Sequence, residues 1–358
     1  MTSEINKNMA GIEKQMRTPE SSSLQGANLE VTQQCDSRCV SCNIWRMSET
    51  SLANKRARIY GKELSFEEHV GVLSELKALG CKAVQLHGGE PLLNPRLADL
   101  VAHCSSLGIF TGIATNGLSM TPDKAKALID AGLGSIKFSL DGPKEMHNRL
   151  RGRKDAYDKQ IRAIKLVQEL DSNQKVYKSI RSNVSSLNLE RIDEVMDIAG
   201  DFSIRDVQFA FYSVIDDTIV KETNEVFGGA VASLRSLIPK ELLPRDTRLI
   251  EKKRNQIIEK ANAYGITLGD TGFFSLPVDQ IPTGIKRRTS RCSIFDYSLT
   301  IDAFGEVVPC EYLRFSLGNT RSKGMREIVN GRKLRDFKRI YSENYRTLRI
   351  CDYCCYSL

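Results

Sequence analysis

The chain has 358 residues, of which 41% are hydrophobic and 27% are charged, and its formal net charge is +8. This length and composition allow a large buried core and more than one domain. No apolar run approaches the roughly 20 residues of a membrane span, and the polar opening residues 1–7 lack the apolar segment of an export signal. We therefore expect a cytoplasmic protein without membrane contact, whose ten cysteines serve as metal ligands and thiols more than as disulfides.

Residues 1–25 are polar and are predicted to form a flexible arm. A short strand is predicted over 26–32, and the loop after it carries Cys35, Cys39 and Cys42. Three thiolates leave one iron of a four-iron cluster without a protein ligand, and an open position is typical of metal sites that coordinate a substrate or cofactor. Half of a zinc site, or buried thiols, remain alternatives for this spacing alone.

Strands and helices alternate from residue 26 to about residue 215, which predicts an α/β fold with a parallel sheet, open or partly closed as a (β/α)6 TIM-like barrel. The first helix begins at the capping box formed by Ser65 and Glu68 and runs to about Gly80. The further predicted helices span 94–107, 121–131, 156–170 and 189–199, and the further predicted strands span 83–87, 110–115, 135–140, 177–183 and 206–211.

Small and polar residues follow the carboxyl ends of three predicted strands. These are the runs Gly88-Gly89-Glu90-Pro91, Thr115-Asn116-Gly117 and Ser139-Leu-Asp141-Gly142. Each run alone is typical of a turn. Barrels place their sites at the carboxyl ends of strands, so we expect all three to face the same mouth as the cysteines. Paired glycines let a ligand approach the backbone, and Glu90 offers an acceptor for an ammonium group.

Together with the cysteine spacing, these runs and His147-Asn-Arg-Leu-Arg151-Gly152 resemble the radical S-adenosylmethionine (SAM) enzymes over residues 26–211. The resemblance implies a [4Fe–4S] cluster on the three cysteines whose open iron chelates SAM. It implies reductive cleavage of SAM to a 5′-deoxyadenosyl radical, which takes a hydrogen atom from the substrate. Asn148 departs from the family's usual pattern, in which an aspartate often follows the histidine.

The resemblance also assigns roles to individual residues. Glu90 is expected to bind the SAM amino group, Ser139 the ribose or carboxylate, and Arg151 and Asn183 the methionyl end. The complete expected cofactor-binding set is Gly88, Gly89, Glu90, Asn116, Ser139, Asp141, Arg151 and Asn183.

The alternation fades between residues 216 and 290. Helices predicted over 231–237 and 248–264 and a possible strand over 265–268 indicate a helical bridge that closes the barrel. Residues 291–358 are predicted to form a small domain, with a β-hairpin over 298–310 and a basic helix from 325 to about 341.

This C-terminal region carries Cys292, Cys310, Cys351 and Cys354, which can close a full metal shell. The hairpin and the Cys-x2-Cys spacing resemble the twitch domain, a reduced relative of the SPASM domain, and imply a second, auxiliary [4Fe–4S] cluster. A zinc knuckle satisfies the same spacing. Cys355 competes with Cys354 as fourth ligand, and two intervening residues favour Cys354. The remaining thiols, expected to be inert by default, are Cys81, Cys104 and Cys355.

Most of the positive charge lies near the end of the chain. From Lys286 onward there are 15 Lys and Arg against 8 Asp and Glu, a local net charge of +7. Nucleic acid is one interpretation of such a patch. Few aromatic residues are interleaved with these charges, so an acidic protein partner or a solvated surface is favoured. A flavodoxin or ferredoxin electron carrier is the partner that the family resemblance suggests.

The sequence leaves four functions open. The leading one resembles the twitch-bearing dehydrogenase of aminocyclitol biosynthesis: an alcohol of a small sugar-like or aminocyclitol-like metabolite is oxidised, and the auxiliary cluster accepts an electron. The alternatives among radical SAM enzymes are a peptide maturase, for which the 25-residue arm is too short to be a leader-binding module, and a sugar epimerase with Cys355 as hydrogen donor. A zinc-containing binding protein is the alternative outside catalysis.

Overall fold

The computed structural model describes residues 24–42, 61–212, 215–229, 240–270, 272–283 and 291–354. These residues form one ten-stranded sheet in the order β10-β9-β8-β1-β2-β3-β4-β5-β6-β7. Strands β1 to β7 are parallel to their neighbours, as is β8 to β1, and only β9 and β10 run antiparallel. The strands are β1 (Gly26–Thr32), β2 (Ala83–Gly88), β3 (Phe110–Thr115), β4 (Ser135–Ser139), β5 (Tyr177–Val184), β6 (Asp206–Phe211), β7 (Thr267–Asp270), β8 (Ser298–Ile301), β9 (Glu306–Val308) and β10 (Gly318–Asn319).

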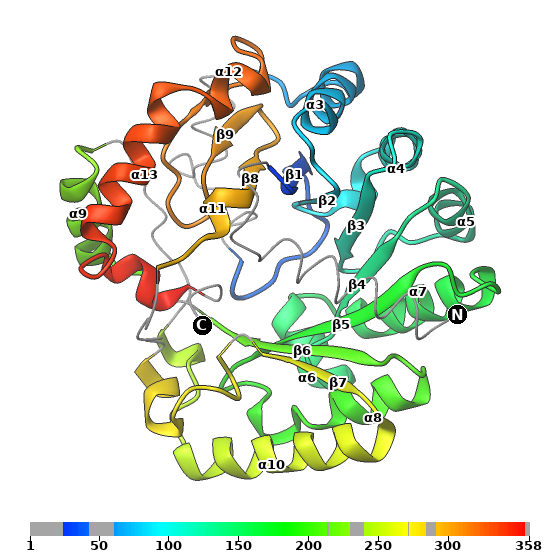
Figure 1. The fold of residues 1–358 in the computed structure, drawn as a ribbon. Coiled ribbons are helices and arrows are strands. Elements are labelled where there is room, and N and C mark those ends of the chain that lie inside the picture. The colour runs from blue at the N-terminus through cyan, green and yellow to red at the C-terminus, as the bar shows by residue number, and fades with distance from the viewer. Residues whose placement is uncertain are drawn as a thin grey trace.

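Helices cover the outer face of this sheet, which curves into a partial barrel (Figure 1). The α-helices are α3 (Phe66–Ala78), α4 (Leu97–Ser106), α5 (Pro122–Asp130), α6 (Lys144–Arg151), α7 (Ala156–Leu170), α8 (Glu194–Asp201), α9 (Asp217–Val226), α10 (Thr247–Tyr264), α11 (Ile294–Tyr297), α12 (Met325–Val329) and α13 (Arg332–Asn344). Short 3-10 helices span Pro91–Leu93, Leu189–Arg191, Lys240–Leu242, Val278–Thr283 and Arg349–Tyr353. None of the helices in the described ranges is both long and apolar enough to cross a membrane.

The two faces of the sheet differ in polarity because side chains alternate along each strand. The outward face packs against the helices and is apolar, and its residues Leu29, Leu86, Ile136, Phe138 and Ile180 are fully buried. The inward face carries mostly polar side chains. The core therefore lies between sheet and helices, and the inside of the barrel is left for polar chemistry.

The predicted alternation of strands and helices is confirmed, including the Ser65 and Glu68 capping box. Three α-helices, α6, α9 and the single turn α11, were not predicted. The helix predicted over 94–107 begins later, at Leu97, because a 3-10 turn precedes it, and the basic helix predicted over 325–341 is divided at Gly331 into α12 and α13. The helix predicted over 231–237 lies outside the described residues, as do residues 1–23 of the predicted arm.

The C-terminal hairpin belongs to the barrel sheet. Strand β8 pairs in parallel with β1, with Gly26 opposite Ser298 and Leu29 opposite Ile301. The predicted hairpin is formed by β8 and β9, and it extends the barrel sheet at the β1 edge. At the other edge β7, which lies in the predicted bridge, pairs with β6. The bridge adds a strand, and no strand pairing among the described residues closes the barrel.

A buried ion pair also joins the hairpin region to β1. The Nη2 atom of Arg314 donates to Oε1 of Glu30 at 2.9 Å, and the two side chains are only 10% and 6% exposed. The other carboxylate oxygen of Glu30 accepts a hydrogen bond of 2.6 Å from Gln33 Nε2. Burial makes such a pair expensive to break, because removing one partner leaves the other charge without compensation.

We predict that Arg314→Met lowers the free energy of unfolding by about 3–5 kcal/mol, because the Glu30 carboxylate then stays buried without its cation. The control is Arg332→Met, which removes a solvent-exposed pair with Asp336 and should cost less than about 1 kcal/mol. Urea unfolding of both variants measures the difference. A loss for Arg314→Met as small as that of the control would contradict the structural role of this pair.

Candidate active site

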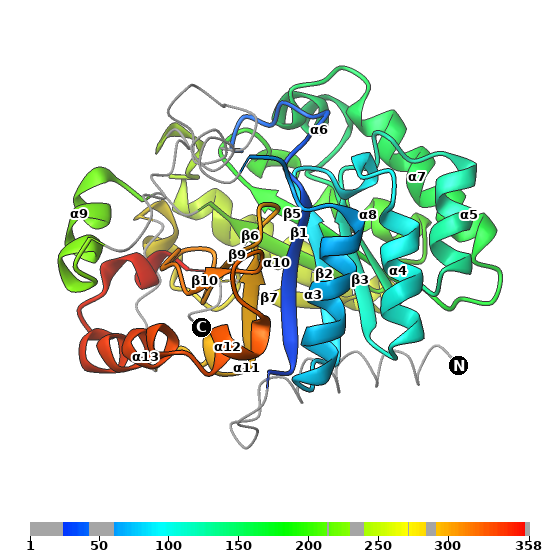
Figure 2. The same cartoon turned by 90° about the horizontal axis from the view of Figure 1, so that it is seen from above.

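The loop after β1 brings Cys35, Cys39 and Cys42 to the carboxyl end of the sheet. Figure 2 shows this loop beside α6, and α11, α12 and α13 lie toward the opposite end of the strands. Two backbone hydrogen bonds hold the loop to α6: Arg38 N donates to Arg151 O at 3.1 Å, and Val40 N donates to Leu150 O at 2.9 Å. The position of the cysteines is therefore fixed by the helix that follows β4.

Glycines allow the cysteine loop to lie this close. A Cβ atom at Gly88 would meet Thr32 O at 2.1 Å, and one at Gly89 would meet Gln34 O at the same distance. The backbone amides of Gly89 and Glu90 donate to these same two carbonyls at 2.8 and 2.7 Å. The paired glycines were predicted to admit a ligand, but the group that occupies the space beside them is the backbone of the cysteine loop itself.

Glu90 follows these glycines and is 1% exposed. Its carboxylate accepts hydrogen bonds from Asn116 N at 2.8 Å, Thr115 Oγ1 at 2.7 Å and Leu92 N at 3.1 Å. Burial nevertheless raises the pKa of Glu90 to about 7. A buried carboxylate of this kind gains from a nearby cation, and an ammonium group bound beside it would lower its pKa again.

Asn116 links the same region to the cysteine loop. Its Nδ2 atom donates to Asp36 Oδ1 at 2.9 Å and lies 3.9 Å from Cys35 Sγ. Ser119 Oγ donates to the other oxygen of Asp36 at 2.6 Å. The end of β3 therefore orients the first turn of the cysteine loop.

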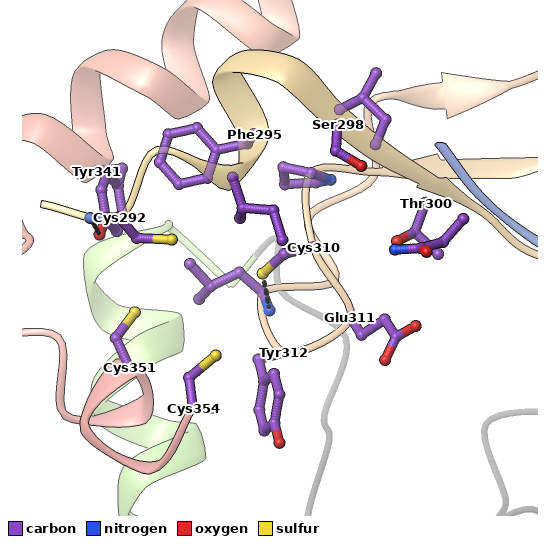
Figure 3. Close-up of a pocket in the computed structure, with 15 residues that line it drawn as sticks. Cys292, Phe295, Ser298, Thr300, Cys310, Glu311, Tyr312, Tyr341, Cys351 and Cys354 are labelled. Carbon is purple, nitrogen blue, oxygen red and sulfur yellow. Dashed lines mark hydrogen bonds between the residues drawn. The ribbon is translucent and has the colours of Figure 1, made fainter. Parts of the chain in front are cut away.

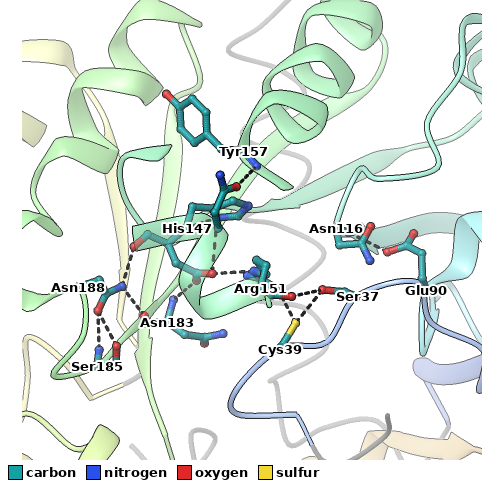
Figure 4. Close-up of polar contacts among 12 residues, drawn as sticks. Ser37, Cys39, Glu90, Asn116, His147, Arg151, Tyr157, Asn183, Ser185 and Asn188 are labelled. Atoms are coloured by element: carbon teal, nitrogen blue, oxygen red, sulfur yellow. Dashed lines mark hydrogen bonds and ion pairs between the residues drawn. The ribbon is translucent and has the colours of Figure 1, made fainter. Parts of the chain in front are cut away.

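The Asp141 carboxylate, which follows β4, is hydrogen-bonded to Asn183 of β5 and to Arg151 of α6. Arg151 lies beside Cys39 of the cysteine loop (Figure 4). One oxygen accepts from Asn183 N at 3.0 Å and the other from Arg151 Nε at 2.7 Å. The Nη1 atom of Arg151 lies 3.9 Å from Cys39 Sγ, and its carbonyl accepts from Ser37 Oγ at 2.9 Å. The predicted residues Asp141, Arg151 and Asn183 therefore lie in direct contact.

Asn188 is a site residue that the sequence alone did not identify. It is fully buried, and its Nδ2 atom donates to Asp141 O at 2.7 Å and to Asn183 O at 2.9 Å. Its Oδ1 atom accepts from Ser185 N at 2.7 Å. Asn188 thus ties the ends of β4 and β5 together. In the sequence Asn188 lies in a polar segment whose composition is typical of an ordinary turn, so nothing marks it as a site residue.

His147 and Asn148, the second of which replaces the aspartate common in the family, each form specific hydrogen bonds. Burial lowers the pKa of His147 to about 4, so its ring is neutral and its Nδ1 atom accepts from Asp141 N at 3.2 Å. Asn148 accepts from Tyr157 N at 2.8 Å and donates to Lys154 O at 2.6 Å, which secures the turn between α6 and α7. Ser139 ends β4, level with Arg181 of β5.

The second group of cysteines lines one pocket beside β8 (Figure 3). Cys292, Cys310, Cys351 and Cys354 share this pocket with Asn28 and with the aromatic side chains of Phe295 and Tyr341. Cys310 Sγ accepts from Leu313 N at 3.1 Å, and burial raises the pKa of this thiol to about 12. Cys355, the competing ligand, lies outside the described residues.

The two spare thiols in the described ranges lie in the hydrophobic core. Cys81 and Cys104 are 1% and 0% exposed, and burial raises the pKa of each. Their surroundings match the prediction of buried thiols outside both sites.

Comparison with known proteins places these features in families. A model of the radical SAM superfamily matches residues 29–202, and a model of the SPASM iron-sulfur cluster-binding domain matches residues 292–355. The chain thus contains a radical SAM domain and a SPASM auxiliary cluster domain. Both matched regions contain the cysteine groups described above.

Curated relatives include a PqqA peptide cyclase of Bradyrhizobium diazoefficiens, 27% identical over 249 residues, which are 69% of this chain and 59% of the relative. An AdoMet-dependent heme synthase of Methanosarcina barkeri is 25% identical over 322 residues, 86% of this chain and 83% of the relative. The chain thus spans less than two thirds of the peptide cyclase. Among solved structures, Streptococcus suis SuiB bound to S-adenosylmethionine has a TM-score of 0.65 at 17% identity, covering 94% of this chain and 74% of SuiB, which confirms the fold.

The cofactors of this radical SAM protein are SAM and two [4Fe–4S] clusters, and the donor sets fit them. Burial and the neighbouring Glu90, Cys39 and Cys42 raise the pKa of the Cys35 thiol to about 12. Such crowded thiols lose their protons only when a metal supplies compensating positive charge. The first site offers three thiols and the second four, which are the numbers that an open and a closed cluster require. In the described residues neither group of thiols converges on a single metal position, so the fit rests on the number and kind of donors.

We predict that Cys39→Ala abolishes SAM cleavage and lowers the iron content from about eight to about four per chain, since only the first cluster is lost. Cys310→Ala is the matched control and should lose the second cluster while SAM cleavage remains detectable. Iron analysis and the release of 5′-deoxyadenosine under strong reductant measure both effects. SAM cleavage that survived in Cys39→Ala would show that the cluster site is wrongly assigned.

A second prediction concerns the pH dependence of stability at Glu90. Because its pKa rises from 4.5 to about 7 on folding, its stabilising contribution is full below pH 4.5 and is lost as the pH rises through about 7. As the pH rises through this range, the free energy of unfolding of the protein without SAM should fall by roughly 2–3 kcal/mol relative to that of Glu90→Gln. Melting temperatures at pH 5 and pH 8 test this. With SAM bound the difference should shrink, and a pH-independent difference without SAM would contradict the raised pKa.

Proposed function

We propose that this radical SAM enzyme modifies a peptide substrate. The observation that carries the proposal is the recurrence of one activity among the curated relatives: PqqA peptide cyclases of three bacteria match at 27–29% identity. These names favour the peptide alternative over oxidation of a sugar-like or aminocyclitol-like alcohol, which was the leading prediction from the sequence. Peptide substrate, product and partners are proposals, because the chain spans only 42–59% of these relatives.

The residues at the carboxyl end of the sheet have distinct tasks in this proposal. Cys35, Cys39 and Cys42 hold the cluster, which when bound supplies the electron that cleaves SAM to the 5′-deoxyadenosyl radical. Glu90 accepts the SAM ammonium group. Arg151, held by Asp141 at 2.7 Å, faces the methionyl carboxylate. Fixing both ends of the methionyl group keeps the sulfonium beside its electron donor and makes the step intramolecular.

The four-cysteine site beside β8 is proposed to receive an electron from the substrate after hydrogen abstraction. A closed shell of Cys292, Cys310, Cys351 and Cys354 suits electron transfer more than substrate coordination, because it leaves no open position. The epimerase alternative depends on Cys355 as hydrogen donor, and this residue lies outside the described ranges.

A flavodoxin or ferredoxin remains the proposed electron partner. The positive charge available to attract it is smaller than the net charge of the region suggests. Several basic residues of the last fifth of the chain form ion pairs with acidic residues of other regions, including Arg321 with Glu68 and Arg349 with Glu222. On α13, Arg339 pairs with Glu343 at 3.1 Å. The excess charge is partly compensated and acts on association rate more than on affinity.

A second candidate substrate is a tetrapyrrole, because the heme synthase match covers 86% of this chain and 83% of the relative. One labelling experiment separates the candidates. Perdeuterated cell extract is divided into a peptide fraction and a small-molecule fraction, and each is incubated anaerobically with reconstituted enzyme, SAM and reductant. Hydrogen abstraction transfers deuterium to 5′-deoxyadenosine, which mass spectrometry detects.

We expect deuterium enrichment with the peptide fraction and little with the small-molecule fraction. Cys39→Ala serves as the control for enrichment that does not depend on the cluster. Enrichment confined to the small-molecule fraction would overturn the peptide proposal, and fractionation of the active material would then distinguish a tetrapyrrole from a sugar-like alcohol.

A further inference from the structure

His87 lies on the inner wall of the barrel, beside the loop that carries the first group of cysteines. Its neighbour Leu86 is fully buried against the helices, so the alternation of side chains along β2 turns His87 toward the inner face. In the register of β1 and β2, His87 lies level with Glu30. The next two residues, Gly88 and Gly89, are the glycines whose backbone lies against the cysteine loop. The ring of His87 is thus placed at the edge of the proposed SAM site.

The carboxylate of Glu311 faces this ring from the second group of cysteines. His87 Nε2 lies 3.6 Å from Glu311 Oε1, which is longer than a hydrogen bond but within the distance of an ion pair. Glu311 follows Cys310 in the chain and lines the same pocket as the four cysteines. Figure 3 shows its carboxylate pointing away from them. The two side chains therefore join the inner wall at β2 to the four-cysteine site.

This contact decides which nitrogen of the His87 ring can accept a proton. Nε2 is buried, and a ring nitrogen that faces a carboxylate oxygen carries the proton, which leaves the lone pair on Nδ1. The His87 side chain is 22% exposed, so the ring can be reached from the space that the inner wall encloses. Once Nδ1 takes a proton, the Glu311 carboxylate would stabilise the imidazolium, and the contact would shorten.

Other charged groups near His87 belong to β1 and to the segment after β9. Glu30 is paired with Arg314 at 2.9 Å, and Arg314 also attracts the Glu311 carboxylate. One guanidinium thus acts on both acidic residues that lie near the ring. Glu311 is held in position by this attraction, and it orients His87 in turn.

We propose that His87 is the base that takes a proton from the substrate when the four-cysteine site takes its electron, with Glu311 as the positioning residue. The proposal rests on the peptide-modifying function and narrows it to an oxidative modification. Because Glu311 and Cys310 are adjacent in the chain, proton and electron would leave the substrate toward neighbouring groups. The substrate would then not accumulate charge.

The atoms and electrons of this step balance. The 5′-deoxyadenosyl radical first takes a hydrogen atom from a C–H bond and leaves a carbon radical on the substrate. A second C–H, N–H or O–H bond of the substrate then breaks, and its proton goes to Nδ1 of His87. The electron pair of that bond and the single electron of the radical supply two electrons for the new bond and one for the four-cysteine site. The product has two hydrogens fewer than the substrate.

The test follows deuterium transfer to 5′-deoxyadenosine in the reconstituted holoenzyme, with the perdeuterated peptide fraction as the probe. His87→Ala should lower the steady-state rate at least tenfold, because the substrate radical cannot lose its proton. The deuterated 5′-deoxyadenosine formed in the first turnover should fall less than threefold, since hydrogen abstraction comes earlier. Added imidazole should raise the steady-state rate of His87→Ala at least fivefold by supplying the missing base. His87→Gln, whose side chain fills the space, should gain less than twofold.

His103→Ala is the matched control, because His103 lies on the outer helix α4, with its Nε2 atom 3.2 Å from Ser74 Oγ. It should leave both measurements unchanged, with or without imidazole. Glu311→Gln should lower the steady-state rate at least threefold, and Glu311→Asp, which keeps the carboxylate, should lower it less. Iron content equal to that of the wild type shows that each variant has folded and holds its clusters.

Two results would overturn the role of His87: loss of the first turnover in His87→Ala together with the steady state, or a steady-state rate that imidazole does not raise. Deuterium transfer confined to the small-molecule fraction would reject the peptide function instead. The same variants assayed with that fraction would then still test His87. Transfer from neither fraction would overturn both proposals.

Discussion

The site depends on the hydrogen bonds made by a single carboxylate, that of Asp141. Its two oxygens hold the backbone of β5 at Asn183 and the guanidinium of Arg151. The carbonyls of Arg151 and Leu150 hold the cysteine loop in turn. A charge that is only 3% exposed is stable here because both of its oxygens are satisfied and one partner is a cation. Loss of the Asp141 carboxylate would therefore disturb the ends of β4 and β5 and the loop that carries the three cysteines.

Much of this structure could be predicted because it depends on interactions between residues that are close together in the sequence. Spacing alone grouped Cys35, Cys39 and Cys42, and the run of small and polar residues at strand ends located Glu90 and Asp141 at the same end of the sheet. The Ser65 capping box fixed the start of α3 because both of its hydrogen bonds are local. Such features depend on residues a few positions apart, where sequence and geometry are directly related.

What could not be predicted involves contacts between distant segments. Asn188 matters because it reaches back 47 residues to Asp141 O, and nothing in its own turn indicates that target. Likewise, Gly88 and Gly89 were associated with the approach of a ligand, but the groups that lie against them are the carbonyls of Thr32 and Gln34, over 50 residues earlier in the chain. The pairing of β8 with β1 joins the two ends of the chain, and hydrophobic alternation predicts a strand without naming its neighbour.

The continuity of the sheet through β8 and β1 has a consequence for electron movement. Strand β1 leads into the loop with three cysteines, and the pocket with four cysteines is built against β8, its hydrogen-bonded neighbour. In the part of the chain that the structure describes, both cysteine groups are therefore anchored in one continuous sheet. The distance between clusters held by these two groups would be set by the spacing of the strands and by the loops that leave them.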